Sequence, residues 1–138
     1  MIQTEKILVK TENEDHIVNI TDVVQNTLTK SGVKEGFILV FLQSTTSSLT
    51  VMEFEDGVLI DLPRALGRLA PKSIDYEHEK AYRDGNEHSH VKSSAVGIDL
   101  AVPFKDGLLL PGTWQQIVAV EFDIRWRNRS IIAQIVSE

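Results

Sequence analysis

Apolar runs typical of strands are more frequent along the chain than runs with the period of a helix. Residues 6–10 and 17–20 each form a short run, and Phe37–Leu42 is apolar without a break. An unbroken run of this length is typical of a strand that is buried on both faces. Turn residues divide the rest of the pattern, and further strands are expected at 49–54, 98–104, 108–110, 114–122 and 130–136.

Two segments show the spacing of apolar positions, every three or four residues, that predicts a helix. The first begins at Thr21, whose hydroxyl suits a helix start, and Gly32 stands where a left-handed residue would end it. The second covers residues 58–69. We expect the first turn of this second helix to absorb Pro63.

A third and shorter helix is expected over Ser89–Val96, where Gly97 would close it. The other residues of 72–90 are polar and lack clear periodicity, which favours irregular structure. Consecutive antiparallel strands combined with two or three helices define the α+β class. At 138 residues, the chain is predicted to form one domain over its whole length, residues 1–138.

Composition excludes several classes of function. The chain has 14 Lys and Arg against 20 Asp and Glu, a net charge of −6, whereas proteins that bind nucleic acid or anionic membranes need a positive field. The absence of cysteine excludes disulfides, thiol catalysis and cysteine-ligated zinc. Residues 1–6 lack the pattern of a signal segment, and no apolar run approaches the ~20 residues that span a bilayer. We therefore expect a cytoplasmic protein with neither nucleic acid nor a membrane as partner.

Three of the four histidines, His78, His88 and His90, lie within thirteen residues. Imidazole is the commonest metal ligand and titrates near neutral pH, and nearby carboxylates could complete a ligand set or orient the rings. His88 and His90 would point to one side of a strand, but on a helix they would diverge by about 200° and could not share a metal. A solvated polar loop is the competing interpretation, and residue types alone favour it.

Two other polar segments have the chemistry of an anion site. Gln43–Ser48 follows the most apolar run and offers hydroxyls and backbone N–H groups at a strand end, although turns rich in Ser and Thr usually cap their own backbone. Ser89–Ser94 places an imidazole, the Lys92 ammonium and hydroxyls at the start of a helix, which suits phosphate. The spaced glycines of a P-loop are absent from it.

Three arginines alternate near the C-terminus. Arg125, Arg127 and Arg129 would share one face of a strand. Their guanidinium groups could bind phosphate or pair with Glu121 and Asp123. A solvated hairpin tip is the interpretation that the sequence favours.

Four segments taken together resemble a known family. They are Leu42–Thr50, Tyr76–His78, Ser89–Ser94 and Gly107–Gln115, and they have the order and spacing of the YjbQ-like family, also called UPF0047. The Gly-Thr-Trp-Gln element at 112–115 is the most specific mark. On physical grounds alone, Trp114 in that element is favoured as a core anchor over a pocket wall. The likeness covers nearly the whole chain.

The resemblance implies an antiparallel sandwich of two β-sheets that assembles as a homotrimer. It also implies a thiamine-phosphate-synthase-like activity of low rate, which joins an aminopyrimidine diphosphate to a thiazole phosphate and releases pyrophosphate. A divalent metal, Mg²⁺ or Zn²⁺, is associated with the histidines of the family, so His78, His90 and His88 are the expected metal ligands. The expected partner besides the chain itself is a small phosphorylated molecule.

The site residues that the resemblance implies fall into two groups. Catalytic roles are expected for His78, His90 and Lys92. Substrate binding is expected from Thr45, Thr46, Ser47, Glu53, Ser93, Trp114 and Gln115. We expect these groups to line one pocket at a subunit boundary, where cations and N–H donors would stabilise the leaving pyrophosphate.

Two positions depart from the family pattern. Ser44 stands where the family usually has a histidine, and Met52 where it usually has an asparagine. Two alternative functions stay open, and the loss of one imidazole favours the first of them. One is a trimeric protein that binds a small anionic metabolite without catalysis, and the other is a metal-dependent phosphoester hydrolase that uses water as nucleophile.

Overall fold

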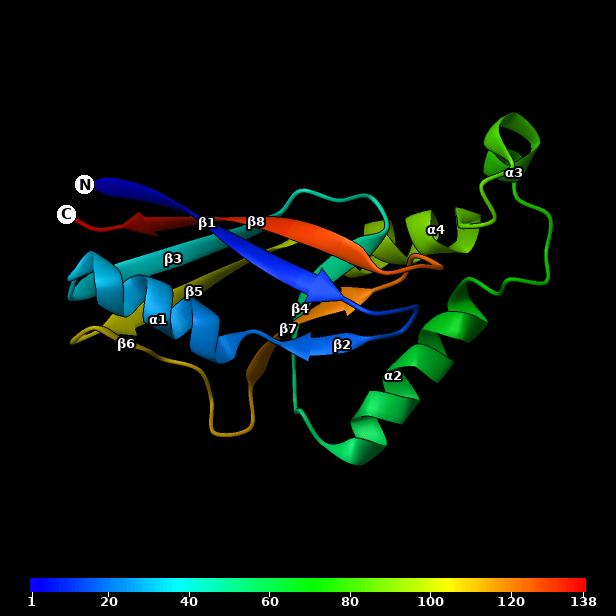
Figure 1. Cartoon of the computed structure of the whole chain (residues 1–138). Coiled ribbons are helices and arrows are strands. Elements are labelled where there is room, and N and C mark those ends of the chain that lie inside the picture. The colour runs from blue at the N-terminus through cyan, green and yellow to red at the C-terminus, as the bar shows by residue number, and fades with distance from the viewer.

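The computed structural model describes all residues, 1–138, as eight strands and four helices (Figure 1). In chain order these are β1 (Ile2–Thr11), β2 (Ile17–Asn19), α1 (Thr21–Ser31), β3 (Glu35–Leu42), β4 (Ser47–Met52), α2 (Asp56–Leu69), α3 (Glu77–Tyr82), α4 (Glu87–Val96), β5 (Asp99–Lys105), β6 (Leu108–Leu109), β7 (Gln116–Glu121) and β8 (Arg127–Val136). Every strand expected from the sequence is present, with ends shifted by a few residues. The predicted α+β class is confirmed.

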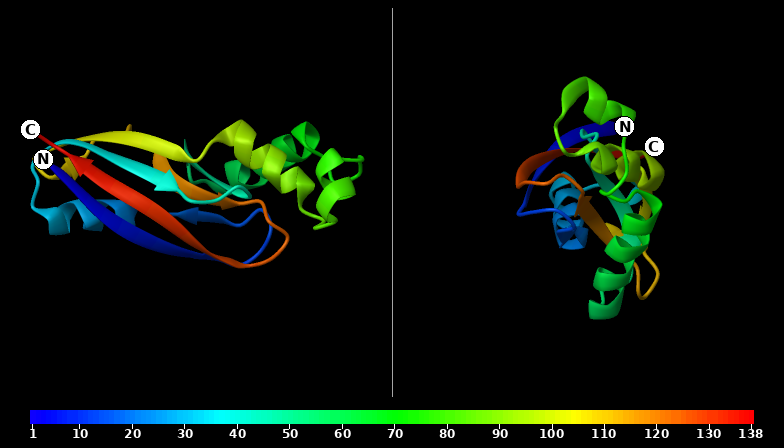
Figure 2. Two further views of the ribbon diagram at one scale, coloured as in Figure 1. Left: turned by 90° about the horizontal axis from the view of Figure 1, so that it is seen from above. Right: turned by 90° about the vertical axis from the view of Figure 1, so that its right-hand side faces the viewer.

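The strands form two antiparallel sheets. A five-stranded sheet has the order β1-β8-β3-β5-β6, and a three-stranded sheet has the order β2-β7-β4. The three-stranded sheet and α1 both pack on one face of the five-stranded sheet. The termini lie together at one end of an elongated body, and α2, α3 and α4 gather at the other (Figure 2). None of the four helices has the length and apolar character required to cross a bilayer.

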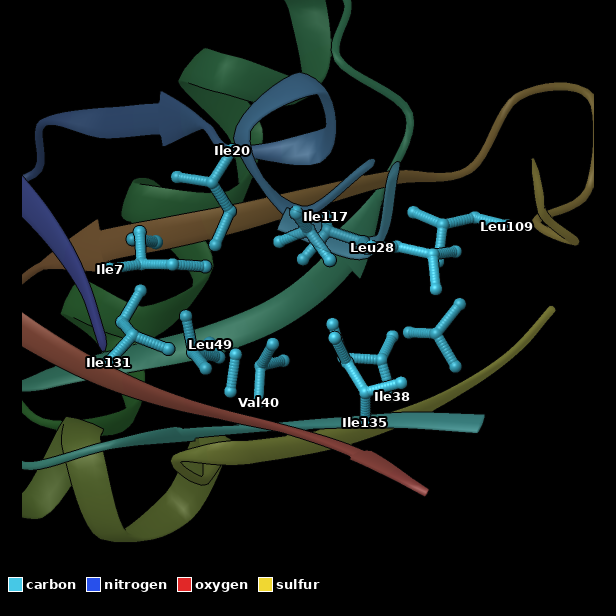
Figure 3. Close-up of a cluster of buried hydrophobic side chains, with 14 of the residues drawn as sticks. Ile7, Ile20, Leu28, Ile38, Val40, Leu49, Leu109, Ile117, Ile131 and Ile135 are labelled. Carbon is cyan, nitrogen blue, oxygen red and sulfur yellow. The ribbon is translucent and has the colours of Figure 1, made fainter. Parts of the chain in front are cut away.

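The main core lies between these layers (Figure 3). Alternate residues of each strand point inward, as the period of two requires. The five-stranded sheet contributes side chains such as Ile38 and Ile131, the three-stranded sheet contributes Leu49 and Ile117, and α1 contributes Leu28. All five side chains are at most 1% exposed, so this layer contains most of the apolar area that the fold removes from water.

A smaller core fills the opposite face of the three-stranded sheet. It contains Met52, Val118 and Phe122, and half-buried leucines of α2 pack against it. No helix covers the outer face of the five-stranded sheet. Phe37 and Phe41 of β3 therefore stay 42% and 43% exposed, and the prediction that this strand is buried on both faces is wrong.

The helices differ from the sequence prediction in three respects. There are four rather than two or three, because the polar stretch also contains α3. Pro63 lies in the middle of α2 rather than in its first turn, and the helix runs through it. α4 begins at Glu87, two residues before the expected start. The two predicted glycine ends are confirmed, since Gly32 follows α1 with a left-handed φ of 73° and Gly97 follows α4.

Candidate functional site

A polar hollow of about 740 Å³ lies where β3 and β8 meet the start of α4. Its lining comes from segments that are far apart in the sequence. The residues are Phe41, Leu42, Gln43, Ser44, Thr45, Thr46, Asp84, Asn86, His90, Ile98, Asp123, Arg127 and Arg129. The structure therefore brings three of the predicted site residues, Thr45, Thr46 and His90, to one cavity.

The hydroxyls of the strand-end segment serve mainly the chain itself. Ser47 Oγ donates to Ser44 Oγ at 2.6 Å, and Ser48 Oγ donates to the Ser93 carbonyl of α4. Ser93 Oγ returns a bond of 2.7 Å to the Ser47 carbonyl. Ser47 and Ser93 thus attach α4 to β4 and are not part of the lining. Thr45 is exposed and its hydroxyl has no protein partner, which leaves it available to a ligand.

Two arginines of β8 form one wall of the hollow. Arg127 and Arg129 are two positions apart, so they project from the same face of the strand. Arg127 donates from Nε and Nη2 to Asp123 Oδ2 at 3.0 and 2.7 Å. Arg129 donates from Nε to Glu121 Oε1 at 2.8 Å and from Nη2 to Thr46 Oγ1 at 2.8 Å. The interpretation of this segment as a solvated tip is wrong for Arg127 and Arg129.

Asp123 connects the two arginine pairs. Its carboxylate is completely buried and accepts from Thr46 Oγ1 at 3.1 Å and from the Ile124 N–H at 2.8 Å, besides Arg127. Burial alone would raise the pKa of Asp123, but the hydrogen bonds from Arg127 and Ile124 outweigh it and lower the pKa below its usual value. The carboxylate is therefore ionised at neutral pH and neutralises Arg127.

His90 enters the hollow from α4, and His78 of α3 lies against it. Their ring centroids are 4.5 Å apart. Burial, and then the neighbouring charge of His78, lower the pKa of His90, while Asp123 and Asp84 oppose this shift. His90 is therefore a neutral imidazole near pH 7 and can accept or donate a hydrogen bond. His78 Nδ1 is buried without a partner.

His88 and Lys92 lie on another face of α4 and do not line the hollow. His88 is 1% exposed, and its Nε2 lies 2.6 Å from Glu14 Oε1. Lys92 is 3% exposed, 3.9 Å from Asp15 Oδ1 and over the Phe122 ring. Because α4 begins at Glu87, the segment 89–94 lies inside the helix and does not offer the free N–H groups that were expected at a helix start.

The residues present do not fit a resident zinc ion. No group of three or more His, Asp or Glu side chains is placed to hold an ion. His88 is turned to Glu14, so it does not join His78 and His90 as a third ligand. A protein zinc site requires at least three protein ligands, so we derive no chemical step through a bound metal.

Glu53 and Trp114 line a second hollow of about 600 Å³, which shares no residue with the first. It lies between the end of β4, the start of α2 and the loop before β7. Trp114 is 72% exposed, so the expectation of a core anchor is wrong. Gln115 is outside both hollows, and its Oε1 accepts from the Gly112 N–H at 2.8 Å.

Sequence reasoning missed several residues of the first hollow. It set Arg127 and Arg129 aside, it did not consider Asn86, and it considered Asp84 only as one of the carboxylates near the histidines. The available signal was the alternation of acids at 121 and 123 with arginines at 127 and 129. If both segments are strands, this pattern predicts that the acids and the arginines pair across a hairpin. Whether the arginines are exposed depends on which face of their strand is buried.

The family comparison agrees with the segments that carry the resemblance. The model described as UPF0047 protein YjbQ-like matches residues 5–138. A UPF0047 protein of Methanocaldococcus jannaschii is 34% identical over 134 residues, which are 96% of this chain and 94% of that protein. The UPF0047 protein YjbQ of Escherichia coli O157:H7 is 36% identical over 121 residues, 86% of this chain and 87% of its own.

Solved structures share the whole fold. A YbjQ-like protein of unknown function from Sulfolobus solfataricus superimposes with a TM-score of 0.89 at 28% identity, covering 100% of both chains. A yjbq/upf0047 family protein from Clostridium acetobutylicum gives a TM-score of 0.85 at 33% identity, covering 96% of this chain and 99% of its own.

Proposed function

The chain belongs to the YjbQ-like UPF0047 family, and we propose that it is a thiamine-phosphate-synthase-like transferase of low activity. It would join an aminopyrimidine diphosphate to a thiazole phosphate and release pyrophosphate. The observation that carries this proposal is the hollow in which Thr45, Thr46 and His90 meet beside two arginines. A small phosphorylated molecule is the ligand that such donors suit.

The chemistry required of the protein is stabilisation of a leaving group. Departure of pyrophosphate builds negative charge on its oxygens, and fixed N–H and O–H donors stabilise that charge without a nucleophile. Arg127 and the Thr45 hydroxyl offer such donors at the hollow. His90, neutral near pH 7, is placed to hold or transfer a proton of the substrate. Mg²⁺ would enter with the diphosphate as part of the substrate.

Ser44 is the reason to expect a low rate. It lines the hollow at the position where the family usually has a histidine. Its Oγ accepts from the Thr46 N–H at 3.1 Å and from Ser47 Oγ, so it shapes the turn and cannot replace an imidazole in proton transfer. The same observation favours one alternative, a protein that binds a small anionic metabolite without turnover.

A direct assay separates these two functions. Purified protein is incubated with both precursors and Mg²⁺, and thiamine phosphate and pyrophosphate are measured together. The proposal expects equal amounts of both products from the wild type and at least a tenfold lower rate from His90→Ala. His16→Ala is the matched control, since His16 lies outside the hollow. Tight binding of a precursor with no product would instead support the non-catalytic binder.

We further propose that the chain assembles as a homotrimer. The uncovered face of the five-stranded sheet presents Phe37 and Phe41 side by side with apolar residues of β5 and β8, and such a patch is typical of an interface. Assembly would also offer a way for Glu53 and Trp114 to approach the first hollow of another subunit. A monomer in light scattering coupled to gel filtration at micromolar concentration would overturn this proposal.

A further inference from the structure

We propose that Arg127 and Arg129 form a clamp for the phosphoryl oxygens of a phosphate or diphosphate group, and that Asp123 and Glu121 are the positioning residues that hold the two guanidinium groups in place. The inference rests on the proposed function, because it assigns the anion-binding part of the same hollow. It adds two residues that the family motif does not include and that the sequence pattern favoured as part of a solvated hairpin tip.

The first argument is the hydrogen-bonding capacity that remains. A guanidinium has five N–H donors in a rigid fork. Arg127 uses Nε and Nη2 on Asp123, and Arg129 uses Nε and Nη2 on Glu121 and Thr46. Neither Nη1 atom has a protein partner, and neither is among the buried unpaired atoms. Both Nη1 groups therefore keep some contact with solvent, and both residues line the hollow.

The second argument is rigidity. A continuous chain of hydrogen bonds runs from Glu121 through Arg129, Thr46 and Asp123 to Arg127. The two carboxylates are completely buried, and Thr11 Oγ1 fixes Glu121 at 2.6 Å. Arginines held in this way have already lost their rotamer freedom, so a ligand need not order them. Free surface arginines would lack this preorganisation.

The third argument concerns which anion fits. Each arginine is neutralised by its own carboxylate, and Asp84 adds a negative charge at the rim. The hollow therefore has no positive field that would attract any polyanion, in keeping with the net charge of −6. Recognition must come from directed donors, which favour the tetrahedral oxygens of a small phosphoryl group. Thr45, with its free hydroxyl, supplies a further donor.

Inorganic pyrophosphate is the probe, titrated calorimetrically into the full chain at fixed ionic strength near 0.15 M. We expect saturable binding, weakened about tenfold or more in Arg127→Gln and only partly restored in Arg127→Lys, because Lys keeps the charge but loses the fork. Arg125→Gln is the matched control. It removes the same charge from the same hairpin, but Arg125 lies outside the hollow, so we expect less than a twofold change.

A second pair of variants tests the positioning role by the sign of the effect. Asp84→Asn and Asp123→Asn each remove one negative charge from the lining. If charge alone mattered, both would tighten pyrophosphate binding. Because Asp84 makes no hydrogen bond and Asp123 holds Arg127, we expect tighter binding in Asp84→Asn and at least fivefold weaker binding in Asp123→Asn. Circular dichroism establishes that each variant is folded, and the Arg127 series decides the matter if Asp123→Asn is not.

Three outcomes would overturn the clamp. The first is that the wild type shows no binding of pyrophosphate at millimolar concentrations. The second is an equal loss of pyrophosphate affinity in Arg125→Gln and Arg127→Gln, and the third is tighter binding in folded Asp123→Asn. The proposed transferase activity fails separately. If pyrophosphate binding depends on Arg127 but no thiamine phosphate forms, the clamp is supported and the transferase activity is overturned. If thiamine phosphate forms at the same rate in Arg127→Gln, the transferase activity is supported and the clamp is overturned.

Discussion

The two adjacent threonines of the hollow should respond differently to the same change. Thr46→Val removes a hydroxyl from a side chain that is 6% exposed, and valine fills the same volume. Thr46 Oγ1 donates to Asp123 at 3.1 Å and accepts from Arg129 Nη2 at 2.8 Å. Thr45→Val makes the identical change one residue earlier, where the hydroxyl is exposed and has no protein partner. The pair therefore provides its own control.

The structure sets the expected magnitude. A hydrogen bond to a charged group contributes about 1.5–3 kcal/mol, and Thr46 makes two. Asp123 keeps its bonds to Arg127 and Ile124, and Arg129 keeps those to Glu121, so neither charge is left alone and the loss should fall at the low end. We expect a decrease of about 2–3 kcal/mol in the free energy of unfolding, with Thr45→Val within about 0.5 kcal/mol of the wild type.

Urea denaturation followed by circular dichroism at pH 7 measures this difference, with m-values that should be equal in all three proteins. In a thermal melt, Thr46→Val should lower Tm by roughly 7–10 °C for a chain of this length. Thr45→Val should nevertheless weaken the binding of pyrophosphate, because it removes a donor at the hollow without loss of stability. Equal stabilities of the two variants would refute the hydrogen-bonded chain through Thr46.

Three further predictions test other parts of the structure. Gly36→Ala should lower the free energy of unfolding by more than about 3 kcal/mol and yield little folded protein, because φ is 150° and a Cβ would lie 2.0 Å from the Val136 carbonyl oxygen. Gly67 lies in α2 with open space around it, so Gly67→Ala should raise the free energy of unfolding by about 0.5–1 kcal/mol in the same urea assay. The pKa of His90 is lowered in the folded protein, so as the pH falls the unfolded chain protonates His90 before the folded protein does. Stability should therefore fall as the pH drops below about 6.5 toward the pKa of His90 in the folded state. His90→Gln should flatten this part of the pH–stability curve. Arg129→Met should lower the free energy of unfolding by about 3–5 kcal/mol, because it leaves buried Glu121 without its cation. In a double-mutant cycle, adding Glu121→Gln should recover part of that loss. Additive losses would contradict the pairing of Arg129 with Glu121.

The sequence predicted elements whose signals are local. The helix from Thr21 to Gly32 was predictable because its left-handed end needs only a glycine at one position. The role of β3 was not, since a run of apolar residues indicates burial but not by what, and one face of this strand has no covering element within the chain. The helix α3, six residues long and polar, has no periodicity from which to detect it.

Only part of the candidate site could be predicted from the sequence. The resemblance placed Thr45, Thr46 and His90 in the site, and the structure brings them to one hollow. The competing roles of His88 and His90 depended on whether 88–90 form a strand or a helix, and the helix turns them apart. Trp114 was misjudged because the type of residue does not reveal whether the loop that carries it is covered.

The arginine wall is in physical terms the end of the main core. Inward-facing positions of β8 continue without a break from Ile131 to Arg129 and Arg127, and those of β7 continue from Ala119 to Glu121. The same alternation that fills the sandwich with apolar side chains therefore delivers opposite charges to its last layer, where the sheets part and the hollow begins. A slip of one residue in either strand would expose the core and separate the ion pairs together. Stability and ligand geometry are consequently coupled at both arginines, because Arg129, 11% exposed, and Arg127, 35% exposed, each pair with a carboxylate that is completely buried.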